Sequence, residues 1–475
     1  MRCAAALVAL ALPAAAEEPS PASVRKAIEQ ALDRPVFASA WWAAEVRSLT
    51  SGRVLYERNA GKNMTPASTL KLLTTAAALD AFGPEARLRT TVETAGRLDG
   101  TGRVLGDVFL VGRGDPLLAR AGTDGRTAFD VLADALQDAG VKRIEGRLVG
   151  HEGLFADRRG EDWEWSDLVW CYGAEISALS WNDNCADLKV SAGERLGEPA
   201  RVERAPETRY YTVVSTASTG PAGVESDLRL ERDLGSNRIR VSGSFPLGGA
   251  PEELRVALED PALYAATVFV EALEARGIRV AAGPATSAEP LPSGARILVD
   301  NDSPTLAEIL KPINKDSQNL YTELLLRLLG ARLKGNGSLT VGRDALAEFL
   351  ERLGLGRSAA LQDGSGLSRT DLVTPRDLVG LLVAMDRHPH AAAFRDSLAV
   401  AGVDGTLEHR MRGTSAEGRV LGKTGTLRQT HALAGYLTTR SGARLVFSIV
   451  VNHHTAPARD ATQAIDAVLA ALAGS

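Results

Sequence analysis

The sequence contains little of what builds metal centres or membrane spans. Its 475 residues include three cysteines and seven histidines, with no His-Glu-x-x-His segment and no cysteine cluster. Metal sites need such ligands at close spacing, so we expect no metal and no other cofactor. No apolar run reaches the roughly 20 residues of a transmembrane helix. Charges of both signs are interspersed and sum to −5, which excludes the basic surface of a nucleic-acid-binding protein.

The most apolar segment lies at the N-terminus. Met1 and Arg2 precede the run AAALVALALPAAA at 4–16, which is followed by two glutamates. A positive start, a short apolar run and small residues at its end are typical of a secretory signal peptide. We therefore expect residues 1–16 to be removed and the mature chain to work in the periplasm or elsewhere outside the cytoplasm.

Two cysteines remain after this cleavage, because Cys3 leaves with the signal. In an oxidising compartment Cys171 and Cys185 are expected to pair. Such a bond closes a loop of about 15 residues and adds about 3 kcal/mol to the free energy of unfolding. The alternative is two unpaired buried thiols.

The pattern Ser-x-x-Lys, which can supply a nucleophile and its base, occurs twice. Ser23 and Lys26 begin the segment SVRKAIEQALDR, which has one apolar stripe and otherwise solvated positions. That arrangement predicts an amphipathic helix at the surface. Ser68 and Lys71 instead follow two strand-like runs joined as in a hairpin. Leucines stand beside Lys71 at positions 70, 72 and 73.

The sequence around Ser68 predicts the start of a packed helix. Thr65 can cap a helix with Pro66 at its first position, and Gly83 marks the end. Ser68 then falls in the first turn, where free backbone N–H groups and the helix dipole favour an anion. Lys71 lies on the same face, and desolvation favours its neutral amine, which can act as a general base for Ser68.

Two further motifs follow in the chain. LGKTGTL places Lys423, Thr424 and Gly425 in a strand; such a lysine can bind a carboxylate, and the glycine lets an extended peptide pair with the strand edge. The segment KDSQNLYTELLLRLLG puts Ser317-x-Asn319 at the start of a helix. Ser-x-Asn also occurs at 180–182, so this motif is weak when taken alone.

Together the three motifs match the set found in penicillin-binding proteins and class A β-lactamases. Longer phrases narrow the match: SALSWNDN at 177–184, DGSGLSR at 363–369, AGVDGTL at 401–407 and GRVLGKTGTL at 418–427. With them the chain resembles the D-alanyl-D-alanine carboxypeptidase/endopeptidase family S13, the class C low-molecular-mass penicillin-binding proteins of the DacB type. The resemblance covers nearly the whole mature chain.

The resemblance implies an α/β (α+β) fold. A serine β-lactamase/penicillin-binding transpeptidase-like domain, with an antiparallel sheet flanked by helices, is interrupted by a large insertion of two nested, mainly β domains. The length of the chain and the 246 positions from Lys71 to Ser317 agree with an insertion. We expect the catalytic domain at 17–85 and 291–475, inserted domain II at 86–105 and 173–290, and nested domain III at 106–172.

The resemblance also assigns catalytic roles. It makes Ser68 the acylated nucleophile and Lys71 its general base, while Ser317 passes a proton to the leaving amine. Asn319 orients Lys71 and the substrate amide. Lys423 binds the terminal carboxylate of the substrate and helps to hold Lys71 neutral.

Substrate contacts are implied by the same resemblance. Thr424 adds a hydroxyl contact to the terminal carboxylate of the substrate. The backbone N–H groups of Ser68 and Thr426 form the oxyanion hole. Arg369, which alone could be a solvated loop cation, lies beside the cleft and binds the peptide side chain. Glu152 stands near the position where an Asp is expected to contact a diaminopimelate side chain, and it could do the same work.

The predicted reaction is hydrolysis of D-Ala-D-Ala stem peptides of peptidoglycan through a Ser68 acyl-enzyme, with endopeptidase cleavage of cross-links at the same site. β-Lactam antibiotics should acylate Ser68. The alternatives are a β-lactamase and a non-catalytic cell-wall-binding or β-lactam-sensing protein. The segment GRGDP at 112–116 is interpreted as a turn, and the C-terminal helix as core packing, with loose membrane attachment as its alternative.

Overall fold

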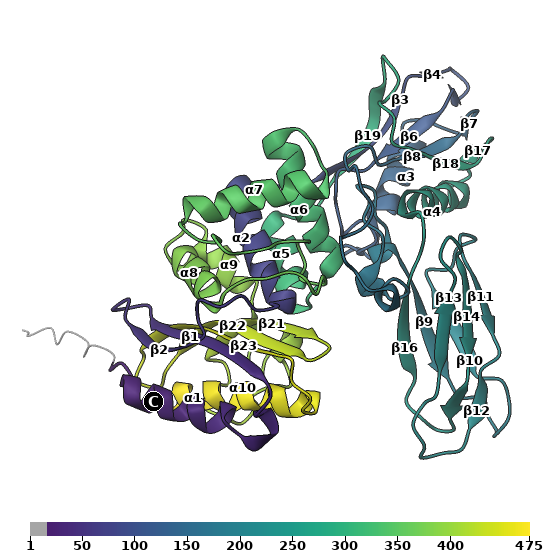
Figure 1. The fold of residues 1–475 in the computed structure, drawn as a ribbon. Coiled ribbons are helices and arrows are strands. Elements are labelled where there is room, and N and C mark those ends of the chain that lie inside the picture. Colours follow the sequence, from purple (N-terminus) through teal and green to yellow (C-terminus); the bar gives the residue numbers. More distant parts are fainter. Residues whose placement is uncertain (1–16) are drawn as a thin grey trace, which may run out of the picture.

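The computed structural model describes residues 17–475. The predicted signal peptide at 1–16, with Cys3, lies outside the described residues. Among those that are described, no helix is both long and apolar enough to cross a membrane. Two parts of the chain stand side by side, one formed by both chain ends and the other by the middle of the sequence (Figure 1).

The first part is built around a six-stranded antiparallel sheet in the order β2-β1-β23-β22-β21-β20. Hairpin connections explain the neighbouring positions of β1 and β2 and of β21, β22 and β23, whereas β1 joins β23 from the other end of the chain. The strands are β1 (Trp41–Ser48), β2 (Val54–Arg58), β20 (Ala399–Val400), β21 (Val420–Leu427), β22 (Thr430–Thr438) and β23 (Arg444–Asn452).

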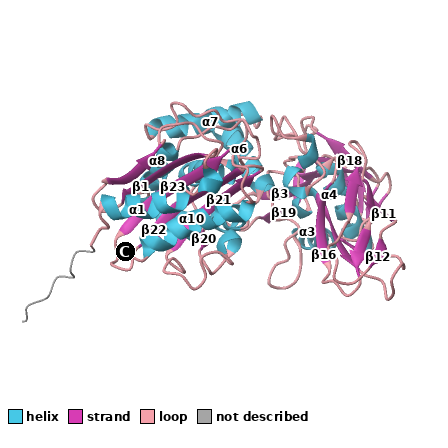
Figure 2. Ribbon diagram, turned by 60° about the horizontal axis from the view of Figure 1, so that its bottom comes forward, coloured by secondary structure: helices cyan, strands magenta, loops and turns pink. Residues whose placement is uncertain are grey.

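Helices cover both faces of this sheet, so its central strands are apolar on both sides. One face packs on α1 (Pro21–Leu32) and α10 (Ala458–Ala473), which bury their apolar stripes against β1, β22 and β23. The C-terminal helix is therefore core packing, as expected. The opposite face carries a helical layer (Figure 2). Its helices are α2 (Lys71–Phe82), α5 (Leu306–Lys315), α6 (Asn319–Lys334), α7 (Leu339–Arg352), α8 (Pro375–Asp386) and α9 (Ala391–Asp396).

The middle of the chain leaves the first part after α2 and returns before α5. Strands β3 (Arg89–Thr94) and β19 (Arg296–Asp302) pair antiparallel and carry the chain out and back. They belong to a five-stranded sheet in the order β18-β8-β6-β3-β19, against which α3 and α4 pack. The other elements of this part are β6 (Val108–Val111), α3 (Ala128–Asp138), β8 (Leu148–His151), α4 (Pro261–Ala275) and β18 (Pro284–Ser287).

Small sheets complete the insertion. Four short strands form the order β17-β7-β5-β4: β4 (Arg97–Leu98), β5 (Arg103–Leu105), β7 (Arg143–Ile144) and β17 (Arg279–Val280). A separate all-β part runs from β9 to β16 in three sheets. Its strands are β9 (Cys185–Ser191), β10 (Arg201–Ala205), β11 (Thr212–Ser215), β12 (Ser218–Gly220), β13 (Arg229–Arg232), β14 (Arg238–Ser242), β15 (Ser244–Pro246) and β16 (Glu252–Ala257).

This strand pairing does not follow the nested boundaries expected from the sequence. The range 106–172 forms no sheet of its own, because its strands β6 and β8 pair with β3 and β18 outside that range. Alternation of apolar residues predicts strands but not their partners, which is why the sequence misplaced this boundary. We propose that the nested domain spans 185–257 instead and that 86–184 and 258–302 form the outer inserted domain.

Candidate active site

Ser68 lies in a short turn at the start of the central helix α2. The turn is a 3-10 helix, η2 (Ala67–Leu70), and α2 begins only at Lys71. The start expected at Thr65 and Pro66 is therefore too early. The backbone of Ala67 has φ 48°, a left-handed conformation that non-glycine residues rarely adopt and that is found where the surroundings enforce it.

Two other segments of the chain lie in close contact with the backbone of this turn. A side chain at Gly366, which has φ 76°, would lie 2.0 Å from the Ala67 carbonyl oxygen. A side chain at Gly425 would lie 2.7 Å from the carbonyl oxygen of Pro66 and 3.2 Å from the backbone nitrogen of Ser68. Gly425 thus serves first to let β21 approach the Ser68 turn, a reason that differs from the peptide pairing expected from the sequence.

The amine of Lys71 is fully buried and lies between three oxygen atoms. Its Nζ is 2.8 Å from Ser68 Oγ, 2.7 Å from Asn319 Oδ1 and 2.7 Å from the Ser365 carbonyl oxygen. A neutral amine has two N–H groups and one lone pair, so donation to Asn319 and Ser365 leaves the lone pair for the Ser68 hydroxyl. The geometry suits a base that accepts the proton of Ser68.

Burial lowers the pKa of Lys71 from its ordinary value of 10.5 to about 7. Three carboxylates oppose this effect, namely those of Asp363, Glu323 and Asp371. Near neutral pH the amine is therefore divided between its neutral and charged forms. This is the range in which a general base works well in an enzyme.

Ser317 and Asn319 stand at the start of α6 (Asn319–Lys334). Ser317 has φ 65°, and Asn319 donates from Nδ2 to the Tyr172 carbonyl at 2.9 Å. This donation fixes the amide so that Oδ1 faces Lys71. The structure therefore brings the second motif to the first, as the family resemblance implies.

Lys423 of β21 is also fully buried. Its Nζ lies 2.9 Å from Ser317 Oγ and 2.9 Å from the Thr424 carbonyl oxygen, and burial together with nearby Lys71 lowers its pKa well below 10.5. Thr424 donates from Oγ1 to Thr406 at 2.8 Å, while Thr426 is exposed next to the Ser68 turn. All three motifs are thus joined in one continuous set of polar contacts.

A buried acidic group beneath Lys71 was not found from the sequence. Glu323, one turn along α6 from Asn319, is fully buried and accepts from the backbone N–H groups of Gly364 and Ser365 at 2.9 Å each. Arg327 donates to its other oxygen at 3.0 Å. Glu323 thus holds the loop whose Ser365 carbonyl accepts from Lys71, and no motif in the sequence marks it.

Asp363 shapes the same loop. Its carboxylate accepts from the backbone N–H groups of Ser365, Gly366 and Ser368, so Asp363 holds the turn of this loop. It also accepts from Trp163 Nε1 at 2.9 Å. Trp163 belongs to the insertion, so this bond connects the two parts of the chain beside the site.

Arg369 follows this loop and faces the insertion. Its guanidinium forms an ion pair with Glu164, and its side chain is 31% exposed. Trp163 and Glu164 come from the polar segment EDWEW, whose two tryptophans were the available signal for a functional loop. The role of Arg369 in binding a peptide side chain stays a prediction.

Glu152 is already engaged within the insertion. Its carboxylate forms an ion pair with Arg158 and accepts from Ser177 Oγ at 2.8 Å, and the residue is 7% exposed. A carboxylate neutralised in this way is poorly placed to receive a substrate cation. Its predicted substrate contact therefore gains no support from the geometry.

The cysteines form the expected disulfide, Cys171–Cys185. The bond ties the short helix η4 (Cys171–Gly173) to the start of β9. Tyr172, which accepts from Asn319, lies inside η4, so the disulfide fixes the segment that orients the second motif.

Fold and site together define a serine acyl-transfer enzyme of the penicillin-binding type. The model of the D-Ala-D-Ala carboxypeptidase 3 (S13) family matches residues 24–472. A D-alanyl-D-alanine carboxypeptidase from Actinomadura sp. (strain R39) is 36% identical over 464 residues, which are 95% of this chain and 84% of the relative. The chain therefore belongs to this family of serine-type D-Ala-D-Ala carboxypeptidases.

Solved structures agree on the fold. Penicillin binding protein 4 (dacB) from Haemophilus influenzae superimposes with a TM-score of 0.81 at 23% identity, covering 95% of this chain and 99% of the other. The predatory peptidoglycan endopeptidase Bd3459 from Bdellovibrio bacteriovorus gives a TM-score of 0.51 at 16% identity, covering 90% and 91%. The expected fold class, a penicillin-binding domain with a large insertion, is confirmed.

Proposed function

We propose that the protein removes the terminal D-alanine from peptidoglycan stem peptides through an acyl-enzyme on Ser68. The observation that carries this proposal is the Lys71 amine, which is fully buried and bonded at once to Ser68, Asn319 and the Ser365 carbonyl. Family membership supplies the substrate class, and the site supplies groups for each step.

Acylation begins when Lys71 Nζ takes the proton of the Ser68 hydroxyl. Ser68 Oγ forms a bond to the carbonyl carbon of the penultimate D-alanine, and the negative charge on the carbonyl oxygen faces the backbone N–H groups of Ser68 and Thr426. The approach of β21 at Gly425 supports this pairing of donors. Loss of one such donor typically costs about 3 kcal/mol of transition-state stabilisation.

The leaving amine needs a proton when the C–N bond breaks. Ser317 Oγ lies 2.9 Å from Lys423 Nζ and two positions before Asn319, which contacts Lys71, so we assign to Ser317 the transfer of the proton from Lys71 to the leaving nitrogen that the family resemblance implies. Water then attacks the acyl-enzyme, with Lys71 again as base, and releases the shortened peptide.

Lys423 and Thr424 bind the terminal carboxylate of the substrate. Burial favours the neutral amine of Lys423 in the empty site, and a bound carboxylate shifts this balance toward the ammonium. The resulting positive charge keeps Lys71 neutral, so substrate binding itself prepares the base. Arg369 then contacts the peptide side chain from the loop above.

The same groups accept other acyl donors. A β-lactam presents a strained amide and a carboxylate, so it acylates Ser68, and cross-linked peptides are cut in the manner of an endopeptidase. The name of the Haemophilus relative, penicillin binding protein 4, and that of the Bdellovibrio endopeptidase support these extensions. The disulfide and the N-terminal sequence support a place outside the cytoplasm, in the periplasm.

Release of D-alanine from a synthetic stem pentapeptide tests the proposal. The mature protein and its Ser23→Ala variant should both release one D-alanine per peptide, whereas Ser68→Ala should lose at least a thousandfold in rate, since the nucleophile is gone. Hydrolysis of penicillin without any release from peptide would instead identify a β-lactamase. A stable penicillin adduct with no release would identify a sensor.

A further inference from the structure

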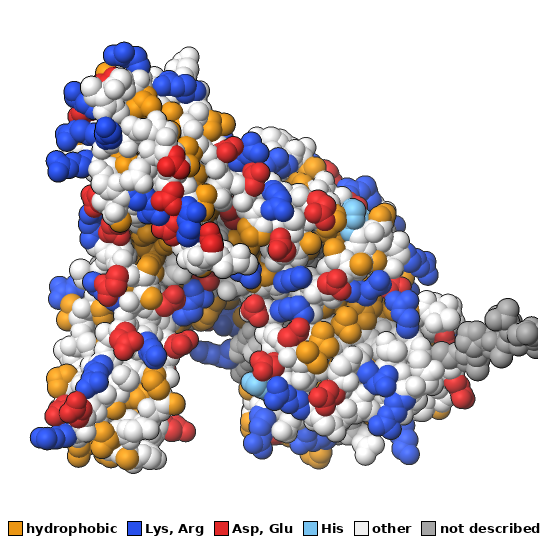
Figure 3. All heavy atoms as spheres, turned by 180° about the vertical axis from the view of Figure 1, so that it is seen from behind, with side chains coloured by type: hydrophobic (Ala, Val, Ile, Leu, Met, Phe, Trp, Pro, Cys, Tyr) orange, Lys and Arg blue, Asp and Glu red, His pale blue; other side chains and the backbone are white. Residues whose placement is uncertain are grey.

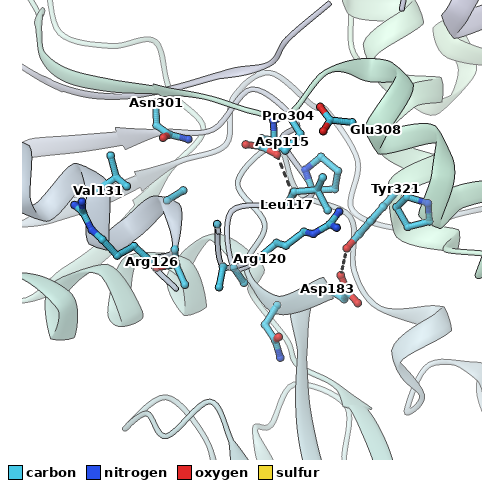
Figure 4. Close-up of a pocket in the computed structure, with 18 of the residues that line it drawn as sticks. Asp115, Leu117, Arg120, Arg126, Val131, Asp183, Asn301, Pro304, Glu308 and Tyr321 are labelled. Atoms are coloured by element: carbon cyan, nitrogen blue, oxygen red, sulfur yellow. Dashed lines mark hydrogen bonds between the residues drawn. The ribbon is translucent and has the colours of Figure 1, made fainter. Parts of the chain in front are cut away.

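Acidic and basic side chains are mixed over the face of the molecule in Figure 3. Charges of both signs, among them those of Arg120 and Glu308, also line a cavity of about 810 Å³ between the insertion and α5 (Figure 4). Three carboxyl groups of the catalytic domain differ from these, because they are fully buried near the base of the site. They belong to Glu323, Asp363 and Asp371. Their charge therefore acts on the base rather than on the surface.

Asp363 and Asp371 are the first and last residues of the loop 363–371, which carries the Ser365 carbonyl to Lys71. The backbone N–H groups of Gln362 and Asp363 donate to Oδ1 of Asp371, at 2.7 and 3.4 Å. Its Oδ2 is buried, and no N–H or O–H group within residues 17–475 donates to it. The carboxyl groups of Asp371 and Asp363 are themselves in hydrogen-bonding contact. The two acids thus meet where the loop begins and ends.

Hydrogen-bond donors are divided unequally between these two acids. Asp363 accepts from three backbone N–H groups and from Trp163 Nε1, and these donors reach both of its oxygens. Asp371 has donors on one oxygen only, and a buried carboxylate oxygen without a donor is costly. Two carboxylates in contact also repel each other where water is excluded. A proton on Asp371 removes both costs, because its O–H then donates to Asp363. Burial and the contact with Asp363 raise the pKa of Asp371 well above its ordinary value, which agrees with this assignment.

The other charged groups around the two acids have partners of their own. Glu323 accepts from the backbone N–H groups of Gly364 and Ser365 as well as from an arginine, so its oxygens are satisfied as a carboxylate. Burial lowers the pKa of Lys423 well below 10.5. The ion pairs near the loop are those of Arg327 with Glu323 and Asp157, Arg343 with Glu161, and Arg369 with Glu164. Asp363, in contrast, forms no ion pair within residues 17–475.

A second negative charge at Asp371 would act against the base. A carboxylate at Asp371, as at Asp363, raises the pKa of Lys71 and so favours the ammonium form. A proton on Asp371 removes this effect and leaves more of Lys71 as the neutral amine that accepts the proton of Ser68. The same O–H group closes the loop that holds the Ser365 carbonyl 2.7 Å from Lys71 Nζ.

We propose that Asp371 is a positioning residue that is kept as the neutral acid and donates its proton to Asp363, so that it holds the Ser365 carbonyl against Lys71 without adding charge beside the base. The inference rests on the proposed function in that it takes Lys71 as the base. Asparagine at position 371 would reproduce the pair, because its amide donates from Nδ2 and accepts at Oδ1. Leucine has a similar size and can do neither.

Infrared difference spectroscopy tests the protonation of Asp371 without reference to activity. Spectra of the mature protein and of its Asp371→Asn variant are compared at neutral pH in the C=O stretching region of protonated carboxylic acids. The parent should show one such band that the variant lacks. The comparison cancels the signal of Asp115, a buried acid at the edge of the cavity in Figure 4 whose pKa burial raises to about 7. Spectra without a difference in this region would overturn the proposal.

The rate of labelling by a fluorescent penicillin, measured from low to high pH, tests the positioning role. Asp371→Leu should slow labelling about tenfold or more, since a buried hydrogen bond is lost, and Asp371→Asn should recover most of this loss and keep the pH midpoint of the parent. The matched control is Asp138→Leu, at an exposed acid without an ion pair in the described part of the chain, and it should label like the parent.

Two results of this assay would overturn the proposal. A full rate in Asp371→Leu would show that the side chain does not position the loop. A midpoint that falls by about one pH unit or more in Asp371→Asn would show that Asp371 carries a charge in the parent. The second comparison and the infrared spectra stand even if Asp371→Leu does not fold. A parent protein that penicillin does not label would overturn the proposed function instead, and the infrared result would still decide whether Asp371 is protonated.

Discussion

The lowered pKa of Lys71 predicts how the rate of acylation depends on pH. A shift from 10.5 to about 7 corresponds to about 5 kcal/mol of preference for the neutral amine, at 1.36 kcal/mol per pKa unit. At pH 7 about half of the protein then carries a neutral base, roughly a thousandfold more than an ordinary lysine would provide. The side chain is fully buried, so solvent screening does not reduce this effect.

The sign of the dependence follows from the form that reacts. Only neutral Lys71 accepts the proton of Ser68, so the rate of acylation should rise with pH through a midpoint near 7 and fall about tenfold per pH unit below it. The assay is the second-order rate of labelling by a fluorescent penicillin between pH 5 and 9. Lys71→Arg, which replaces the base by a permanent cation, should lose at least a thousandfold in rate, while Lys26→Arg should match the parent protein.

A rate that stays constant from pH 5 to 9 would contradict this pH dependence, and so would a midpoint near 10. Either result would mean that Lys71 does not titrate as the base in the acylation step. Unfolding experiments provide an independent check. Because the unfolded chain binds the proton between about pH 7 and 10.5 and the folded chain does not, Lys71 makes the free energy of unfolding increase with pH in that window.

Three further changes probe other parts of the site. Gly425→Ala places a methyl group 2.7 Å from the Pro66 carbonyl, so it should lower penicillin labelling at least a hundredfold, whereas Gly100→Ala, in open space, should not. Replacing Cys171 and Cys185 by alanine should lower the free energy of unfolding by about 3 kcal/mol in urea titrations and also slow acylation, while a loss of stability alone would contradict the link to Asn319. Glu323→Gln should slow acylation at neutral pH, since the amide cannot accept from both the loop and its arginine; an unchanged rate would show that the buried carboxylate does not position the Ser365 carbonyl.

Much of the site could be predicted from the sequence because its residues fall in short motifs with a fixed order. Ser68 and Lys71 share a turn, and the other two motifs each supply neighbouring residues, so local spacing carries the information. The preference for Ser68 over Ser23 also followed from local signals: Ser23 lies exposed in the first turn of α1, and Ser68 lies half-buried in the turn η2 directly before α2.

Contacts between distant segments could not be read in this way. Glu323 reaches the loop at Gly364, and Trp163 reaches Asp363 across 200 positions. The ion pair of Glu152 with Arg158, six positions away, is not marked by any sequence pattern either, and the predicted substrate contact of Glu152 stays a prediction. The nested domain was misplaced for the same reason, since strand partners are set by long-range packing.

The helix start at Ser68 differs from its prediction for a physical reason. Cap and proline signals describe the intrinsic preference of the segment, whereas Gly366 and Gly425 bring two other segments within contact of its backbone. Tertiary packing overrides the local preference and imposes the left-handed backbone at Ala67. Departures of the backbone from its local sequence preference are expected at functional sites.

Every step of the proposed mechanism depends on Ser68 as the nucleophile. The most direct measurement is to label the mature protein with a fluorescent penicillin and to locate the adduct by peptide mass mapping, with Ser68→Ala and Ser23→Ala treated in parallel. We expect a single adduct on Ser68 that is lost in Ser68→Ala and kept in Ser23→Ala. An adduct elsewhere, or one that survives Ser68→Ala, would contradict it.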